Sequence, residues 1–94
     1  MLERTFQSNL IKDLKDKFEG SIVIKTDPRY KQGLPDLIIF HKDKWAALEC
    51  KANPKSHKQP NQEYYVKKMN DMSFARFITP ENKSEVINEL QRFF

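Results

Sequence analysis

Apolar residues recur every three or four positions between residues 2 and 18, a spacing that predicts an amphipathic helix. Gly20 is expected to end this helix, because glycine readily adopts the left-handed conformation that closes one. The same spacing predicts a helix over residues 62–72, with Asn61 as its N-cap and Pro60 just before it. Both helices are expected to pack one apolar face on the rest of the chain.

Short apolar runs between polar segments predict strands. They cover residues 21–26, 37–40, 45–50 and 74–79. The polar segment 41–44 predicts a hairpin turn between the second and third runs, which are apolar at nearly every position and are therefore expected to be central, with helices covering both faces. The run at 74–79 is expected at an edge. A last helix should then open with Thr79 as its capping residue and Pro80 at its first helical position.

The order of these elements is helix, three strands, helix, strand, helix. This order predicts an α/β fold with a mixed sheet flanked by helices, and the length of 94 residues allows one domain, residues 1–94. A hydrophobic content of 38% and a charged content of 32% are typical of a soluble globular protein. No apolar stretch approaches the roughly 18 residues of a membrane span, and the N-terminus lacks the apolar core of a secretory signal. A cytoplasmic protein without membrane partners is expected.

Three charged residues in and beside the predicted hairpin carry the chemistry. If its turn is centred between residues 42 and 43, Asp36 lies directly opposite Glu49, and Lys51 shares their face of the sheet. Directly opposite residues have Cβ atoms about 4.5 to 5.5 Å apart, so two carboxylates would repel each other unless a cation compensates. Oxygen donors suit Mg²⁺ or Mn²⁺ rather than zinc, and the backbone carbonyl of Cys50 is well placed to add one.

An alternative interpretation needs no metal. Asp36 and Lys51 would form an ordinary cross-strand ion pair at the end of the sheet, with Glu49 solvated. Cys50 is the only cysteine, so it cannot form an intramolecular disulfide, and its apolar neighbours predict a buried strand residue rather than a nucleophile.

Basic residues lie on both sides of the acidic motif. The formal net charge is +4, which suits a polyanionic partner. In the loop 52–61 we expect Lys55, His57 and Lys58 to contact the DNA backbone. His57 is not expected to bind metal, because no second histidine or cysteine stands at ligand spacing from it.

Four short motifs occur in an order that resembles a known family. They are Glu3 with Gln7, Gly33-Leu34-Pro35-Asp36, Glu49-Cys50-Lys51, and Gln62 at the start of the second helix. Together they resemble the PD-(D/E)xK nuclease superfamily, and most closely its VRR-NUC family, whose small stand-alone members are mostly viral. The valine-arginine-arginine element of that family is represented only by Ala75-Arg76-Phe77, a weak match.

The resemblance implies a restriction-endonuclease-like αβββαβ core with a C-terminal helix. It also implies a metal-dependent, structure-selective DNA endonuclease, similar to Holliday-junction resolvases and acting in the cytoplasm of a bacterium or of an infected host cell. Asp36 and Glu49 would hold Mg²⁺ or Mn²⁺ with Glu3 as an auxiliary ligand, while Lys51 would position the attacking water. Gln62 would hydrogen-bond that water or the scissile phosphate. The alternatives are that Glu3 only favours the helix dipole and that Gln62 only caps its helix.

The substrate that the resemblance implies is branched DNA, especially four-way junctions. Two symmetric cuts in a junction require two sites, so a C2 homodimer is expected, with Phe93, Phe94 and Tyr30 as candidates for its interface. Two other classes of function remain open from the sequence. One is a non-catalytic nucleic-acid-binding module that retains the nuclease fold, and the other is a toxin-like or regulatory protein that binds another protein.

Overall fold

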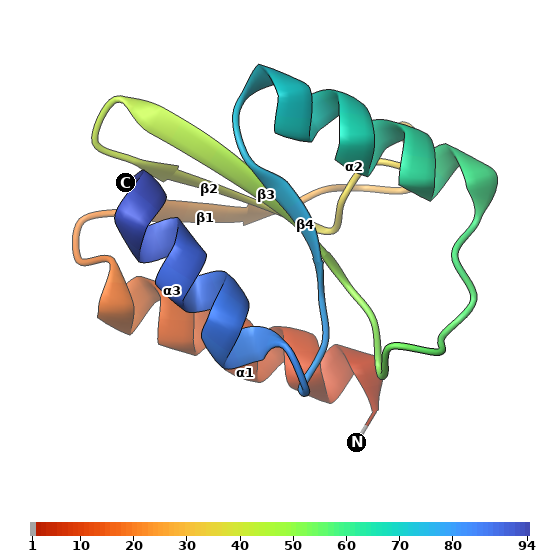
Figure 1. The fold of residues 1–94 in the computed structure, drawn as a ribbon, viewed down its shortest axis with the longest axis horizontal. Helices are drawn as coiled ribbons and strands as arrows, with labels where there is room; N and C mark the ends of the chain where they lie inside the picture. Colours follow the sequence, from red (N-terminus) through yellow and green to blue (C-terminus); the bar gives the residue numbers. More distant parts are fainter. Residues whose placement is uncertain (1) are drawn as a thin grey trace.

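The chain alternates helices with short strands, in the order expected from its apolar pattern (Figure 1). The structure is a computed structural model and describes residues 2–94. Its elements are α1 (Glu3–Lys17), β1 (Ile22–Lys25), β2 (Leu37–His41), β3 (Lys44–Cys50), α2 (Pro60–Met72), β4 (Ala75–Ile78) and α3 (Lys83–Phe93). The predicted αβββαβ order with a C-terminal helix is confirmed. None of the described helices combines the length and the apolar character that crossing a membrane requires.

The four strands form one mixed sheet in the order β1-β2-β3-β4. β1, β2 and β3 are antiparallel neighbours, whereas β4 runs parallel to β3 at the opposite edge from β1. A parallel neighbour requires a crossover, and α2 provides it. The mixed sheet and its flanking helices are therefore as predicted, and so is the edge position of the last strand.

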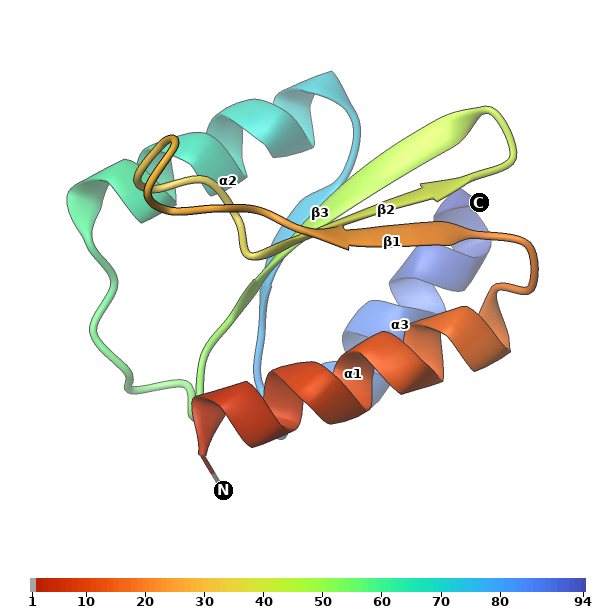
Figure 2. The same cartoon turned by 180° about the vertical axis from the view of Figure 1, so that it is seen from behind.

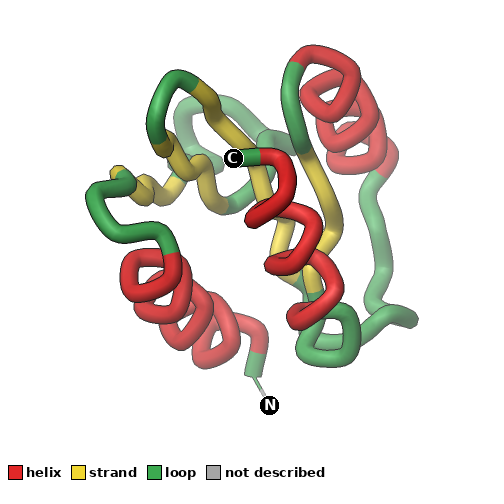
Figure 3. Tube along the Cα trace, turned by 60° about the vertical axis from the view of Figure 1, so that its left-hand side comes forward, coloured by secondary structure: helices red, strands yellow, loops and turns green. Residues whose placement is uncertain are grey.

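The larger core lies between the sheet and the pair α1 and α3, which share one side of it (Figures 1 and 3). Alternate strand residues point to this side. The buried members of this core are Phe6, Leu10, Leu14, Phe18, Leu37, Ile39, Ala46, Leu48, Cys50, Phe74, Ile78, Val86 and Leu90. Burying each large apolar side chain contributes roughly 1.5–3 kcal/mol, so this cluster is the main source of stability.

The other face of the sheet is covered only in part. α2 packs on β3 and β4, where Val66 lies over Ala47 and Ala75. On β1 and β2, by contrast, Ile24 and Phe40 are exposed. The expectation that helices cover both faces of the central hairpin is therefore wrong for β2, because the single crossover helix is too narrow to span four strands.

Two helices begin at residues other than those predicted. α2 begins at Pro60 with Gln59 as its N-cap, not at residue 62 after Asn61. α3 begins at Lys83 rather than at Pro80, because the segment 79–82 closes into a turn of its own. In that turn Oδ1 of Asn82 accepts the Thr79 N–H at 2.7 Å, and Oγ1 of Thr79 accepts the Asn82 N–H at 3.2 Å. The first and last strands are also shorter than predicted, Ile22–Lys25 and Ala75–Ile78.

Gly33 allows the segment before β2 to approach α2 closely. Its φ is +90°, a conformation that residues with a Cβ rarely adopt. A Cβ at this position would lie 2.7 Å from Cγ of Asn61, in the first turn of α2. Both the backbone conformation and the available space therefore require glycine.

Gly33→Ala is expected to destabilise the fold more than Gly20→Ala does. Gly20 has a similar φ of +87° but has no atom within 4 Å of the Cβ position, so it isolates the conformational cost. We expect about 1 kcal/mol for Gly20→Ala and roughly 2–3 kcal/mol for Gly33→Ala, from urea unfolding of both variants. Equal losses would show that the contact with Asn61 is relieved at no cost.

Candidate functional site

The β2–β3 hairpin brings two carboxylates together. At the end away from its turn, Leu37 lies opposite Leu48. One step further in the same register, Asp36 stands opposite Glu49, which is the arrangement that a symmetric hairpin predicts. Oδ2 of Asp36 accepts the backbone N–H of Cys50 at 2.9 Å, which fixes the aspartate beside β3.

Lys51 and Gln62 complete the cluster around Glu49. Nε2 of Gln62 donates to Oε2 of Glu49 at 3.0 Å, and Nζ of Lys51 donates to Oε1 of Gln62 at 2.9 Å. The lysine also lies 3.7 Å from Oε2 of Glu49. The ion pair thus joins Lys51 to Glu49, so the alternative of an Asp36–Lys51 pair beside a solvated Glu49 is wrong.

Gln62 has a second partner, at the start of its own helix. Its Oε1 accepts the backbone N–H of Gln59 at 3.1 Å, so the side chain caps α2 as well as joining Lys51 to Glu49. Capping and site assembly are therefore two effects of one side chain, and they do not exclude each other.

Glu49 is a buried carboxylate with one unsatisfied oxygen. The residue is 2% exposed, and its Oε1 has no hydrogen-bond partner among the described residues. Burial, followed by repulsion from Asp36, raises the pKa of Glu49 to about 7, although Lys51 acts in the opposite direction. Burial likewise raises the pKa of Asp36, against the opposing N–H of Cys50. Two ionised carboxylates are unfavourable in this setting unless a cation compensates.

Cys50 can contribute its backbone rather than its thiol. Burial raises the pKa of the thiol to about 12, as suits an inert strand residue. Its N–H points toward Asp36 on the β2 side, whereas the N–H of Lys51 donates to Ile78 on the β4 side at 3.0 Å. A strand residue directs its N–H and C=O to the same side, so the Cys50 carbonyl faces Pro35, which has no N–H. The described strands therefore offer this carbonyl no ladder donor.

These groups fit a hard divalent cation such as Mg²⁺ or Mn²⁺. The unpaired Glu49 oxygen, the Asp36 carboxylate and the Cys50 carbonyl are the oxygen donors that such ions prefer. Within residues 2–94, no three His, Cys, Asp or Glu side chains are grouped closely enough to hold a metal by themselves. Water would therefore have to complete the coordination, as is usual for Mg²⁺. Glu3, exposed in the first turn of α1, acts on both carboxylates through its charge, which further raises their pKa values.

The loop from β3 to α2 carries the three residues expected to contact DNA. Figure 2 shows it leaving β3 near the start of α1 and arching to the start of α2. Lys55 and His57 are exposed on this loop, whereas Nζ of Lys58 lies 5.0 Å from the centre of the Phe77 ring. Lys58 is thus held against β4, while Lys55 and His57 are open to solvent.

A small pocket that the sequence did not indicate lies beside Lys51. Its volume is about 190 Å³. The lining residues are Lys51, Asn53, Pro54, Lys58, Phe77, Thr79 and Asn82. Two lysines, Lys51 and Lys58, are therefore among the residues around one space. The pocket lies between the β3–α2 loop and the turn before α3. It was not apparent from the sequence because only the folded chain brings these two segments together.

Arg76, the weak match to the valine-arginine-arginine element, is engaged within the fold. Its guanidinium donates to the side chain of Asn70, lies 3.5 Å from Oε1 of Glu89 and stacks 4.1 Å from the centre of the Phe74 ring. These contacts join α2, β4 and α3. Arg76 is therefore held by side chains of three neighbouring segments and is not directed at the carboxylate cluster.

Comparison of the chain with family models, with curated proteins and with solved structures gave no match. The chain is therefore characterised by the composition of its candidate site. The site consists of a carboxylate pair, a lysine and a helix-capping glutamine at the open end of a β-hairpin, in a small mixed α/β domain.

Proposed function

We propose that this chain is a metal-dependent endodeoxyribonuclease that hydrolyses phosphodiester bonds. The observation that carries the proposal is Glu49, a buried carboxylate with an unpaired oxygen, standing opposite Asp36 and held by Lys51 and Gln62. A fold that needed only a stable sheet end would gain nothing from placing a half-buried acid opposite a buried one. A bound cation would compensate the charges of both carboxylates.

The proposal is also supported by the resemblance to the VRR-NUC family. Its separate sequence motifs, around Asp36, around Glu49 and at Gln62, are joined by hydrogen bonds in one cluster. Glu3 acts on the same cluster from α1. Motifs that match by chance have no reason to meet at one place in the fold.

Each side chain has a role that follows from its contacts. Asp36, Glu49 and the Cys50 carbonyl would hold the ion, and Glu3 would bind one of its waters. When bound, Mg²⁺ or Mn²⁺ makes a water molecule more acidic and offsets the negative charge that builds on the phosphate. Lys51 orients the attacking water from its place between Glu49 and Gln62.

Positive charge beside the cluster would hold the DNA. Lys58 borders the small pocket next to Lys51, and Lys55 and His57 belong to the same loop. With a net charge of +4 in 94 residues, contacts to the phosphate backbone would supply most of the affinity. We propose branched DNA, in particular four-way junctions, as the substrate, cut by a homodimer in the cytoplasm.

Cleavage of labelled four-way junction, flap and linear duplex DNA tests the proposal. We expect the native chain to cut the junction at symmetric positions with Mg²⁺ or Mn²⁺ and to stop when EDTA is added. Junction binding without cutting, under either metal, would instead favour a non-catalytic binding module. The absence of binding even at low salt would favour a role in binding another protein.

A further inference from the structure

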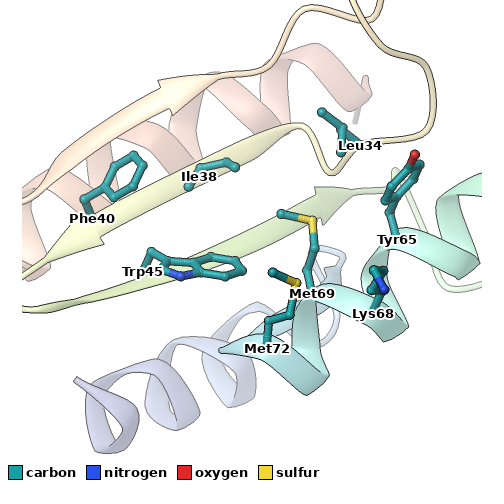
Figure 4. Close-up of a pocket in the computed structure, with 8 residues that line it drawn as sticks. All are labelled: Leu34, Ile38, Phe40, Trp45, Tyr65, Lys68, Met69 and Met72. Carbon is teal, nitrogen blue, oxygen red and sulfur yellow. The ribbon is translucent and has the colours of Figure 1, made fainter.

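The face of the sheet that α2 leaves uncovered carries a continuous apolar surface. Ile22 and Ile24 of β1 stand beside Phe40 and Ile38 of β2, their register partners, and all four point to the α2 side. Next to them is a hollow of about 320 Å³ (Figure 4). The hollow is lined by Leu34, Ile38, Phe40, Trp45, Tyr65, Lys68, Met69 and Met72. We call this whole surface the open face.

The composition of the open face disfavours DNA as its occupant. Lys68 is the only charged residue among those lining the hollow, so the surface offers little to a phosphate backbone. Soluble domains rarely leave so many large apolar side chains exposed together, and such surfaces usually mark contacts between proteins. These properties favour a protein surface that is itself apolar as the occupant.

The open face has the area that a dimer of this chain requires. Ile22, Ile24, Phe40 and Met72 are between 43% and 67% exposed. Taking roughly 180 Å² as the full area of each, these four residues alone present about 400 Å². The half-buried residues of the hollow add to this, so two copies would bury about 1,000 Å² or more in total, the size at which specific interfaces begin.

The open face is also suited to contact with its own copy. In a C2 dimer the same patch meets itself, so it must carry both a protrusion and a matching hollow. Here the exposed isoleucines of β1 stand beside Phe40 and Ile38 of β2, two residues that line the hollow. Phe93 and Phe94, which the sequence suggested for a dimer interface, instead pack on the main core against Phe74 and Phe18.

We infer that the open face is the interface of a C2 homodimer in which the isoleucines of one copy enter the hollow of the other. Asp36 and Glu49 lie further along the same face of β2 and β3, two residues beyond Ile38 and Ala47. At about 3.3 Å per residue, each carboxylate pair lies within roughly 15 Å of the interface residues. The dimer would hold two sites close together. The inference adds an interface to the homodimer of the proposed function, and it does not depend on the cleavage chemistry.

Sedimentation equilibrium of the native chain is the first test. We expect a dimer at micromolar concentration. A chain that remains monomeric at several hundred micromolar would overturn the inference and indicate that another protein covers the open face. No substitution is involved, so this result does not depend on how a variant folds.

The second test locates the interface. Ile24→Lys, which occurs twice in a dimer, is expected to raise the dimer Kd by at least about 100-fold, because both lysines would be buried without partners. Leu2→Lys is the matched control, since Leu2, the N-cap residue of α1, is 63% exposed and lies outside the open face. It should change the Kd less than about twofold. A dimer that tolerates Ile24→Lys in a folded variant, as judged by its circular dichroism, would overturn the assignment even if the native chain is dimeric.

Discussion

Asp36→Asn is expected to lower metal-dependent DNA cleavage by at least about 1,000-fold without disturbing the fold. Asparagine keeps the size of aspartate and an oxygen that can accept the Cys50 N–H, now 2.9 Å from Oδ2. It removes one negative charge from a site that would have to hold a divalent cation, and with it the charge stabilisation on which cleavage depends. Cleavage rates of a labelled junction under single-turnover conditions measure the loss.

Asp43→Asn provides the matched control. Asp43 is an exposed aspartate in the hairpin turn, paired with Lys44, so the same chemical change is made away from the site. It should cleave at the native rate. Lys51→Ala is expected to lose a similar amount to Asp36→Asn, with Lys44→Ala as its control. Retained cleavage in Asp36→Asn would place the active site elsewhere in the chain.

Glu49→Gln is expected to abolish cleavage and, in the absence of metal, to become more stable relative to the native chain as the pH rises. The folded state raises the pKa of Glu49 from 4.5 to about 7, so the folded protein holds this proton more tightly than the unfolded chain. The stability gained from that proton is present below pH 4.5 and is lost as the pH rises toward and through 7. Glutamine cannot ionise, so the variant does not lose stability in this pH range through residue 49.

The size of the effect follows from the shift. Between pH 5 and pH 8 the free energy of unfolding of the variant should rise by roughly 2–3 kcal/mol relative to that of the native chain. Urea unfolding in EDTA measures this difference. Glu85→Gln, a change at an exposed glutamate of α3, should instead follow the native chain at every pH. Parallel curves for Glu49→Gln and the native chain would mean that Glu49 ionises normally.

Addition of Mg²⁺ at pH 8 should offset most of the stability that Glu49→Gln gains over the native chain. An ion that binds only the folded state stabilises it by about 2.7 kcal/mol at 100 times its Kd, and Glu49→Gln removes a donor on which that binding depends. The native chain and Glu85→Gln should therefore gain stability, while Glu49→Gln should not. This measurement detects the ion without requiring any DNA substrate.

Local patterns were sufficient to predict the hairpin and the residues that meet at its open end. A two-residue turn with apolar strands on each side fixes the register, and the register fixes Asp36 opposite Glu49. The identity of the ion pair was not predictable in this way. Lys51 can reach either carboxylate from its strand, and the position of Gln62 on α2 decides that it lies beside Glu49.

Features that depend on contacts between distant segments were predicted less well. The start of α3 was misplaced because Thr79 and Asn82 bond to each other, whereas Thr-Pro by itself is a good helix signal. The uncovered face of β2 was missed because apolar residues on both sides of a strand indicate burial but do not reveal what buries it. The small pocket beside Lys51 depends on the turn before α3 in the same way.

The hydrogen bonds of Gln62 couple the assembly of the site to the fraying of the first turn of α2. Its side chain both closes the first turn of α2 and links Lys51 with Glu49, so the turn and the cluster form one cooperative unit. Each time that turn opens, Lys51 loses the amide oxygen that positions it, and the buried acid loses a donor. The fraction of molecules in which the cluster is assembled therefore depends on the local opening equilibrium of a single helical turn.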